Sequence, residues 1–285
     1  MKKYFIALVA IVLIALVARS TYEMGRHGVS VSSTPVTKTS YVALGDSVAA
    51  GIGLQNYSDS SACNRTNESY PNLVAQARNY NLTNLACTGA TLPEGILGAQ
   101  NVNNLAVAPQ LDKLFALPRP EVISVTIGAN DAGWTSLLAK CYTSTCGSEA
   151  DTATVDARLT AVTSHLTTML TRIRDHYGAT IPKAVVTGYY QLLPAIIGSC
   201  PDATGIDQSE VTWARARQES IISVLKTVTG QFSFATFAPI DFTGHELCSA
   251  NSWEQGISDK APYHPTADGQ AAIARAVESS ITMGK

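Results

Sequence analysis

Tyr41-Val-Ala-Leu-Gly-Asp-Ser-Val-Ala-Ala50 is the segment from which the architecture of this sequence can be worked out. Its first half is apolar, has no helical spacing and stops at Gly45, which is typical of a buried strand that feeds a tight turn. In open α/β sheets, ligands bind where the strands end. Ser47 follows the strand directly and is therefore a candidate nucleophile; the alternative is that Asp46 or Ser47 only caps the next helix.

Three further segments place polar or small residues directly after an apolar run or directly before a helix. They are Asn84-Leu-Ala-Cys-Thr-Gly-Ala90, Ser124-Val-Thr-Ile-Gly-Ala-Asn-Asp131 and Tyr263-His-Pro-Thr-Ala-Asp-Gly269. By order, spacing and residue type, the four segments together resemble the four blocks of the SGNH (GDSL) hydrolases, from about Ser40 to the last predicted helix. The first turn is not the G-x-S-x-G turn of the α/β-hydrolases, which argues against that class.

Predicted strands alternate with predicted helices along the chain. Apolar runs predict five strands, at residues 42–44, 82–86, 122–127, 183–188 and 232–238. Helical spacing predicts helices at residues 69–79, 109–116, 131–138, 150–177, 209–228 and 266–282. This alternation implies an α/β fold, a three-layer α/β/α sandwich around a five-stranded parallel sheet. The resemblance identifies it with the flavodoxin-like SGNH hydrolase fold, in one domain at residues 40–285.

The composition is that of a globular protein, with 46% hydrophobic and 15% charged residues. The formal net charge is -2, whereas nucleic-acid binding depends on clustered Lys and Arg that neutralise phosphates. We therefore predict no nucleic-acid partner. No cysteine pair has the C-x-x-C spacing with a second pair or histidines nearby that a zinc site needs. We predict no metal, and the resemblance implies no cofactor.

The N-terminal segment predicts export. Residues 1–20 combine the basic start Met1-Lys2-Lys3 with an apolar run, Tyr4 to Val17, near the upper length of a signal peptide and short of a comfortable bilayer span. The residues up to Ser20 match a cleavage site poorly, so an uncleaved N-terminal anchor is the alternative. Residues 21–39 have the composition of a flexible tether. We expect a secreted, extracellular protein that meets a membrane only through an uncleaved leader.

The six cysteines suit an exported chain, because disulfides persist outside the cytosol. Export also disfavours the alternative of free buried thiols. Six cysteines allow 15 pairings, and the sequence by itself does not choose among them. The resemblance to secreted SGNH hydrolases implies sequential pairing: Cys63–Cys87, Cys141–Cys146 and Cys200–Cys248.

The resemblance also implies a catalytic site built from all four segments. Ser47 takes the place of the nucleophile and His264 that of the general base, since a serine hydroxyl attacks well only when a base removes its proton. The backbone N–H groups of Ser47 and Gly89 and the side-chain amide of Asn130 take the places of the oxyanion-hole donors. The alternatives are an ordinary turn at Gly89 and an Asx turn at Asn130.

The group that orients His264 departs from the usual family pattern. Most SGNH hydrolases carry an aspartate three residues before the histidine, and that position is Ala261 here. Some secreted members use a backbone carbonyl just upstream instead. We therefore expect a Ser47–His264 dyad in which the carbonyl of Ala261, or that of Pro262, accepts the Nδ1 proton. Asp259 is the alternative orienting group.

Other side chains near the predicted strand ends have a structural interpretation. Asp46 is predicted to hold the turn rather than act as an acid, and Asp131 to cap the helix that follows it. Trp134 and the pair Tyr189-Tyr190 follow strand ends, where they line a pocket or belong to the core.

The predicted function is that of a secreted serine esterase or lipase that cleaves carboxylic esters through an acyl-Ser47 intermediate. Its substrate would be a small-molecule, lipid or polysaccharide ester. One alternative is removal of O-acetyl groups from a polysaccharide. Another is a non-catalytic surface-binding module on the same fold, but binding alone does not require all four of Ser47, Gly89, Asn130 and His264.

Overall fold

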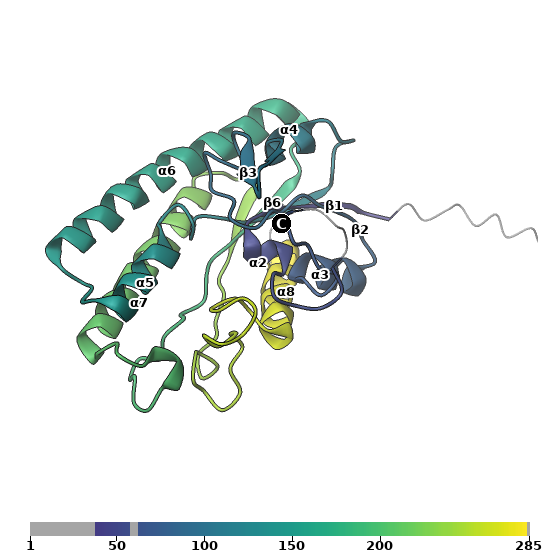
Figure 1. Ribbon diagram of the computed structural model, residues 1–285. Coiled ribbons are helices and arrows are strands. Elements are labelled where there is room, and N and C mark those ends of the chain that lie inside the picture. The colour runs from purple at the N-terminus through teal and green to yellow at the C-terminus, as the bar shows by residue number, and fades with distance from the viewer. Residues whose placement is uncertain (1–37, 58–61, 284–285) are drawn as a thin grey trace, which may run out of the picture. The chain divides into compact units, whose positions relative to one another are not determined.

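The computed structural model describes residues 38–57 and 62–283 (Figure 1). The expected leader at residues 1–20 and the tether up to residue 37 lie outside the described residues. Within the described ranges, no helix is long and apolar enough to cross a membrane.

The centre of the fold is the predicted five-stranded parallel sheet, which is confirmed. Its strands are β1 (Ser40–Gly45), β2 (Asn81–Asn84), β5 (Val122–Thr126), β6 (Lys183–Thr187) and β7 (Ala235–Ala238), in the order β2-β1-β5-β6-β7. The chain builds outward from β1 to β2 on one side and then returns to add β5 on the other. Loops that leave β1 and β5 therefore separate at their carboxyl ends, which is where open α/β sheets bind ligands.

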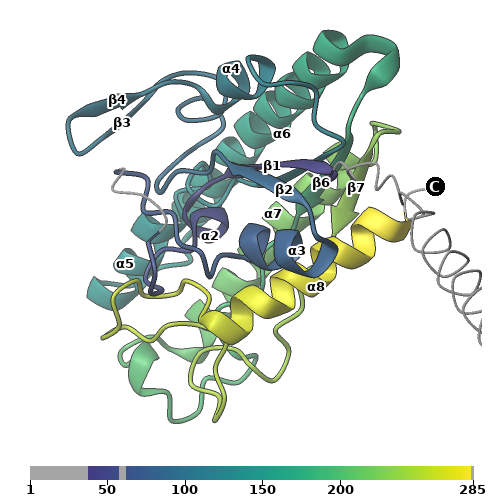
Figure 2. The ribbon, with the colours of Figure 1, turned by 90° about the vertical axis from the view of Figure 1, so that its right-hand side faces the viewer.

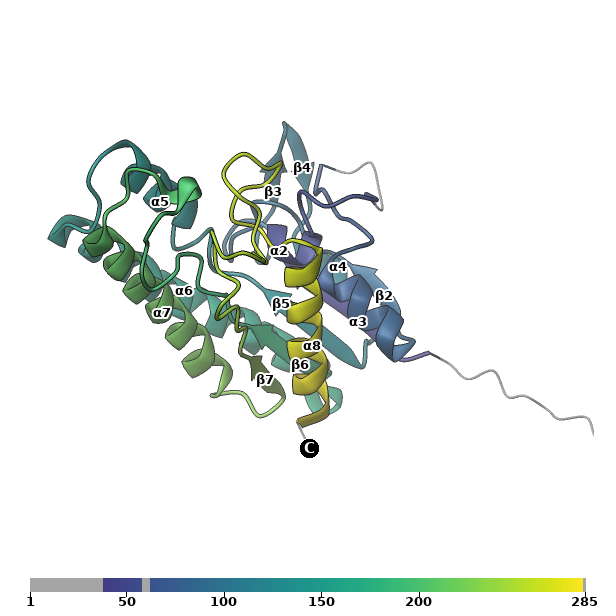
Figure 3. The same ribbon diagram turned by 90° about the horizontal axis from the view of Figure 1, so that it is seen from below.

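Helices cover both faces of the sheet, as the α/β/α prediction requires. The pair α3 (Tyr70–Arg78) and α8 (Ala267–Met283) packs together on one face, and the pair α6 (Glu149–Tyr177) and α7 (Gln208–Thr229) on the other (Figure 3). The shorter elements are α2 (Ser47–Ala50), α4 (Gln110–Phe115), α5 (Trp134–Thr143) and the 3-10 turns η1 (Gly178–Thr180) and η2 (Pro201–Ala203).

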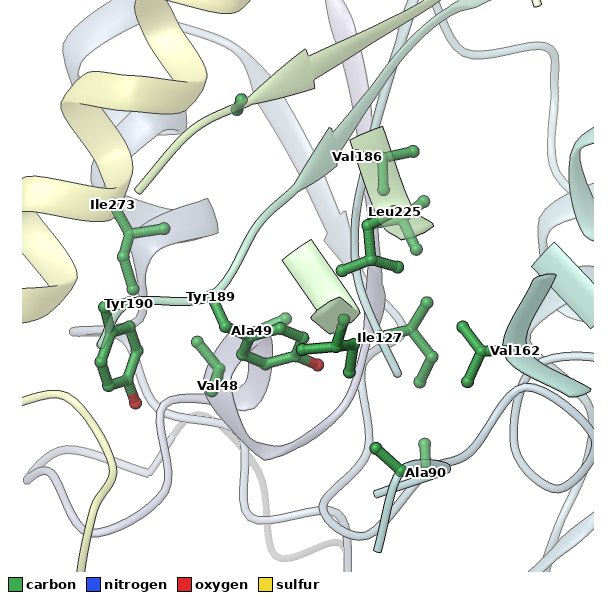
Figure 4. Packing of buried hydrophobic residues seen from close by; sticks show 14 of the residues in the cluster. Val48, Ala49, Ala90, Ile127, Val162, Val186, Tyr189, Tyr190, Leu225 and Ile273 are labelled. Atoms are coloured by element: carbon green, nitrogen blue, oxygen red, sulfur yellow. The ribbon is translucent and has the colours of Figure 1, made fainter. Parts of the chain in front are cut away.

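The long helix α6 shows how the sequence pattern becomes packing. Its apolar residues recur at spacings of three and four and form one buried stripe: Val155, Leu159, Val162, Leu166, Met169, Leu170 and Ile173. Figure 4 shows Val162 of this stripe near Ile127, with Val186 of β6 and Leu225 of α7 beside them. The stripe is core, as the spacing predicts.

A two-stranded antiparallel hairpin was not predicted. It comprises β3 (Gln100–Val102) and β4 (Leu105–Val107) and stands out from the sheet (Figure 2). Its turn is Asn103-Asn104, where φ is +51° and +64°, and Asn tolerates this left-handed region better than most residues.

Two predicted boundaries also shift because local turns intervene. The helix expected from Asp131 begins at Trp134, since Ala132 and Gly133 donate turn hydrogen bonds to Gly128 and Asn130. Similarly, β7 begins at Ala235 because Phe232 and Phe234 lie in a turn.

Three disulfides are present, two between loops and one between α5 and the segment that follows it. They join Cys63 to Cys87, Cys141 to Cys146 and Cys200 to Cys248, which are the pairs that the family resemblance implies.

Candidate active site

The turn after β1 presents Ser47 at the carboxyl edge of the sheet. Gly45 has φ of +142°, and an added Cβ would collide with the Thr126 carbonyl, so only glycine fits. The buried amide of Gln110 holds Gly45 from both sides, accepting from its N–H at 2.8 Å and donating to its carbonyl at 2.9 Å. Asp46 caps α2 by accepting from the Val48 N–H at 2.9 Å. Ser47 is therefore the first residue of a short buried helix.

Ser47 and His264 meet across 217 residues of sequence. The Nε2 atom of His264 lies 2.7 Å from the Ser47 Oγ, a normal hydrogen-bond distance. The hydroxyl comes from the turn after β1, and the imidazole from the loop just before α8. Ser47 is 8% exposed and borders a cavity, so the pair faces a space in which a substrate can lie.

The imidazole of His264 is oriented by a backbone carbonyl. Its Nδ1 lies 3.0 Å from the carbonyl oxygen of Pro262, the second of the two carbonyls expected from the sequence. The Ala261 carbonyl, the first choice, accepts the backbone N–H of His264 at 3.2 Å and also interacts with the imidazole, raising its pKa less than the Pro262 carbonyl does. Asp259 instead accepts the Gly256 N–H at 2.7 Å and is exposed. Because a carbonyl can only accept, Nδ1 carries the proton and Nε2 is free to accept from Ser47.

The environment of His264 favours its neutral form. Burial lowers the pKa of the imidazole below its ordinary value of 6.5, and this effect exceeds that of the hydrogen bonds to the Pro262 and Ala261 carbonyls, which raise the pKa. A neutral imidazole is the form that can act as a base.

Gly89 and Asn130 lie on the wall of the same cavity as Ser47. Gly89 has φ of +77°, and a Cβ there would touch only the Gln100 amide at 3.5 Å, so the backbone conformation rather than crowding by the protein requires glycine. Asn130 Nδ2 donates one hydrogen bond to the Ala90 carbonyl at 2.9 Å, which fixes the amide and leaves its second N–H for another acceptor. The Ser47 N–H is at the start of α2, where backbone donors have no partner within the helix.

The structure agrees with the structural role predicted for Asp46 and contradicts the one predicted for Asp131. Asp46 holds the turn, as expected, and burial raises the pKa of its carboxyl to about 7 although hydrogen bonds from Tyr189 and Val48 lower it. Asp131 does not cap α5, and that prediction was wrong. Its Oδ1 accepts the Leu92 N–H at 2.9 Å and so ties the segment after β2 to the segment after β5.

Two further buried glutamines connect the catalytic segments, and sequence reasoning missed them along with Gln110. Gln255 donates to the Ile52 carbonyl at 3.2 Å and to that of Pro265 at 3.3 Å, linking the loop after α2 to the histidine loop. Gln270 of α8 donates to the Val48 carbonyl at 3.0 Å. A single buried amide leaves no periodic signal, and only its tertiary partners reveal its role.

A mainly apolar cavity of about 700 Å³ opens beside Ser47. One wall is a face of α5, including Trp134, Leu138 and Tyr142, and other lining residues include Tyr189, Tyr190, Leu192 and Ile221. Both expectations for the aromatic residues are therefore met at once, because the two tyrosines are nearly buried and also border the cavity. A cavity of this size and lining can bury an apolar group attached to an ester.

Fold and site together are those of an SGNH hydrolase, and comparison with known families agrees. The chain belongs to the GDSL-like lipase/acylhydrolase family, whose model matches residues 43–272. It is a carboxylic ester hydrolase of that family.

Individual relatives are similar over most of the chain. A lipase of Streptomyces rimosus is 31% identical over 252 residues, which are 85% of this chain and 86% of the relative. The crystal structure of an extracellular lipase from the same species matches with a TM-score of 0.63 and 28% identity, over 85% of this chain and 99% of that one. The structure of phospholipase A1 from Streptomyces albidoflavus NA297 matches with a TM-score of 0.66 and 27% identity, over 86% of this chain and all 100% of that one.

Proposed function

We propose that the protein is a secreted lipase or esterase in which Ser47 is the nucleophile and His264 the general base. The observation that carries this proposal is the 2.7 Å contact between His264 Nε2 and Ser47 Oγ, with Nδ1 anchored on the Pro262 carbonyl. The extracellular relative from Streptomyces rimosus supports secretion.

The proposed mechanism is acyl transfer through Ser47. Ser47 Oγ attacks the ester carbonyl carbon while its proton passes to Nε2 of His264. The carbonyl oxygen becomes negative and is stabilised by the N–H groups of Ser47 and Gly89 and by the free amide hydrogen of Asn130, where a single donor contributes roughly 3 kcal/mol. His264 then gives its proton to the departing alcohol, leaving the acyl group on Ser47. Water, deprotonated by the same imidazole, releases the acid and restores the hydroxyl.

The cavity favours an ester of a fatty acid as the substrate. Burying a CH2 group contributes about 0.8 kcal/mol of binding free energy. Each added methylene of the acyl chain therefore strengthens binding until the cavity is filled. A polysaccharide O-acetyl esterase, the first alternative, needs room for only one methyl group on the acyl side. The relatives named as a lipase and a phospholipase A1 support the preference for lipid esters.

A labelling and chain-length experiment tests both parts of the proposal. A fluorophosphonate probe is expected to label the wild type and not Ser47→Ala, because only an activated serine reacts. With p-nitrophenyl esters, kcat/KM for octanoate is expected to exceed that for acetate by about 10-fold or more, from the methylenes buried in the cavity. Preference for acetate would contradict the lipid assignment, and labelling that persists in Ser47→Ala would contradict the nucleophile.

A variant with a larger side chain on the cavity wall provides the matched control for the acyl-chain preference. Leu138 lies on the α5 wall, is buried and takes no part in the hydrogen bonds of Ser47 and His264. Leu138→Trp is expected to reduce the octanoate preference while acetate hydrolysis stays close to the wild-type rate.

The acid limb of the pH profile of kcat/KM is expected to have an apparent pKa below 6.5. Burial lowers the pKa of His264, so the neutral base is regained as the pH rises through this lowered value, and activity persists into mildly acidic solution. The measurement is kcat/KM for a soluble ester from about pH 4 to pH 8. Asp46→Asn removes a buried carboxyl whose pKa burial raises to about 7, and it is expected to leave this limb in place because Asp46 is not among the groups that shift the pKa of His264. A limb above 6.5 would show that the base is not this imidazole.

A further inference from the structure

Two consecutive tyrosines leave the end of β6 and reach different parts of the site. Tyr189 and Tyr190 are 6% and 3% exposed, and both border the cavity beside Ser47. Figure 4 shows the two rings on either side of Val48, with their hydroxyl groups pointing in different directions. Neither side chain is assigned a part in the proposed chemistry.

The Tyr189 hydroxyl joins the nucleophile turn to the loop that carries Asn130. It donates to Asp46 Oδ2 at 2.5 Å and accepts the backbone N–H of Ala129 at 3.2 Å. Asp46 directly precedes Ser47, and Ala129 directly precedes Asn130. One oxygen atom therefore links the loop that follows β1 to the loop that follows its neighbour β5, and these loops carry Ser47 and Asn130.

The Tyr190 hydroxyl holds the loop that carries His264. It donates to the Tyr263 carbonyl at 2.9 Å. Tyr263 has φ of +65°, a left-handed conformation that is costly for an aromatic residue and persists only where its surroundings enforce it. This residue lies between Pro262 and His264, so its conformation sets the direction of the Pro262 carbonyl toward Nδ1.

Tyr190 is itself firmly held, as a positioning group must be. Its ring stacks on Phe242 with centroids 4.2 Å apart and an interplanar angle of 13°. The side chain of Gln218 donates to the Tyr190 carbonyl and accepts the Leu192 N–H at 3.2 Å. The phenol therefore projects from a backbone and a ring that are both fixed by α7 and by the loop after β7.

We propose that Tyr189 and Tyr190 are positioning residues for catalysis, Tyr189 for the oxyanion hole and Tyr190 for the general base. Neither needs to touch the substrate. Each acts through one hydrogen bond to the backbone next to a catalytic group, and a displacement of about 1 Å in such a site costs up to 100-fold in rate. The inference rests on the proposed Ser47–His264 mechanism and adds two determinants of its geometry.

The test removes each hydroxyl while keeping the ring. In Tyr189→Phe, kcat is expected to fall about 10- to 100-fold with KM within about twofold, because oxyanion stabilisation acts only in the transition state. In Tyr190→Phe, kcat is expected to fall about 10-fold. The acid limb of kcat/KM is also expected to move to lower pH in this variant, since a weaker Pro262 contact stabilises the imidazolium less.

The shift in the acid limb of kcat/KM is expected only for Tyr190→Phe. The charged or titratable groups near Tyr190 and Tyr263 are Asp46, Tyr142, Asp202 and Glu254, and Tyr190→Phe leaves all four in place. Tyr189→Phe removes a hydrogen bond that lowers the pKa of Asp46, but Asp46 is not among the groups that shift the pKa of His264. Burial raises the pKa of the Glu254 carboxyl well above its ordinary range. Tyr189→Phe is expected to leave the limb near its wild-type position.

Tyr41→Phe is the matched control. Tyr41 is fully buried in β1, and its hydroxyl lies 2.7 Å from Ser124 Oγ within the core. This variant loses a buried hydrogen bond of the same kind and is expected to lower the unfolding temperature while kcat stays within about twofold of wild type. Rates are compared at a temperature where the unfolding curve of each variant shows it folded, and per site titrated with fluorophosphonate.

The outcomes separate this inference from the function on which it rests. Normal kcat in both Tyr189→Phe and Tyr190→Phe, with only the unfolding temperature lowered, would overturn the positioning role. Full activity of Ser47→Ala in the same assay would instead overturn the proposed mechanism. A fall in kcat equal in all three phenylalanine variants would show a general loss of stability and would also count against the inference.

Discussion

Ser47→Ala is expected to lower kcat for ester hydrolysis by about 10⁶-fold, the scale on which loss of the nucleophile acts in serine hydrolases. The alanine side chain has no oxygen to form the acyl intermediate, so the imidazole at 2.7 Å has nothing to deprotonate. Residual hydrolysis would come from the oxyanion donors acting on a bound ester and attacking water. The measurement is kcat for a p-nitrophenyl ester, together with the unfolding temperature.

Ser280→Ala is the matched control for this substitution. Ser280 is fully buried in α8, and its hydroxyl donates to the Ala276 carbonyl at 2.9 Å, which is remote from the site. Its kcat is expected to stay within about twofold of wild type, since the lost hydrogen bond affects stability alone. A similar loss of rate in both variants would contradict a specific role for Ser47.

His264→Ala is expected to lower kcat by about 10⁵- to 10⁶-fold, and Ser47→Ala/His264→Ala by no more than the serine variant alone. The two groups act as one unit. Without the base the hydroxyl is a poor nucleophile, and without the hydroxyl the base has no nucleophile to deprotonate. Asp259→Asn is expected to keep kcat within about twofold, since the Pro262 carbonyl and not this carboxylate contacts Nδ1. All three are measured as kcat on the same ester.

His245→Ala supplies the control for loss of an imidazole. This residue stacks on Trp253, and its Nδ1 lies 2.8 Å from the Asn251 carbonyl, so its contacts are outside the Ser47–His264 pair. Near-normal turnover is expected. If kcat of Asp259→Asn instead fell about 10⁴-fold, as it does when an orienting aspartate is replaced, the site would be a triad of Ser47, His264 and Asp259 rather than a dyad.

The sheet and the helices that cover it were predictable because their signals are periodic or continuous. Val122 to Thr126 is apolar enough to be buried on both faces, and the stripe of α6 recurs at helical spacing. The meeting of Ser47 with His264 was predictable in another way, from the order of four short segments that resemble a known family. Periodicity alone would have left Ser47 as a possible helix cap.

Other features depend on tertiary contacts that the sequence does not display. Asp131 lies at a position typical of a helix cap, but its carboxylate accepts the backbone N–H of Leu92 from another segment. The choice between the Ala261 and Pro262 carbonyls depends on the left-handed backbone at Tyr263, which the identity of that residue disfavours. The hairpin turn at Asn103-Asn104 is the one missed element that carried a readable local signal, two adjacent residues tolerant of positive φ.

The wall contributed by α5 has an evolutionary implication. This helix borders the cavity through Trp134 and Leu138, and neither side chain is hydrogen-bonded to Ser47 or His264. Selection acting on one helical surface can therefore retune which acyl groups are accepted without disturbing bond cleavage. Enzymes that share this fold can therefore come to differ in their substrates while they catalyse the same reaction.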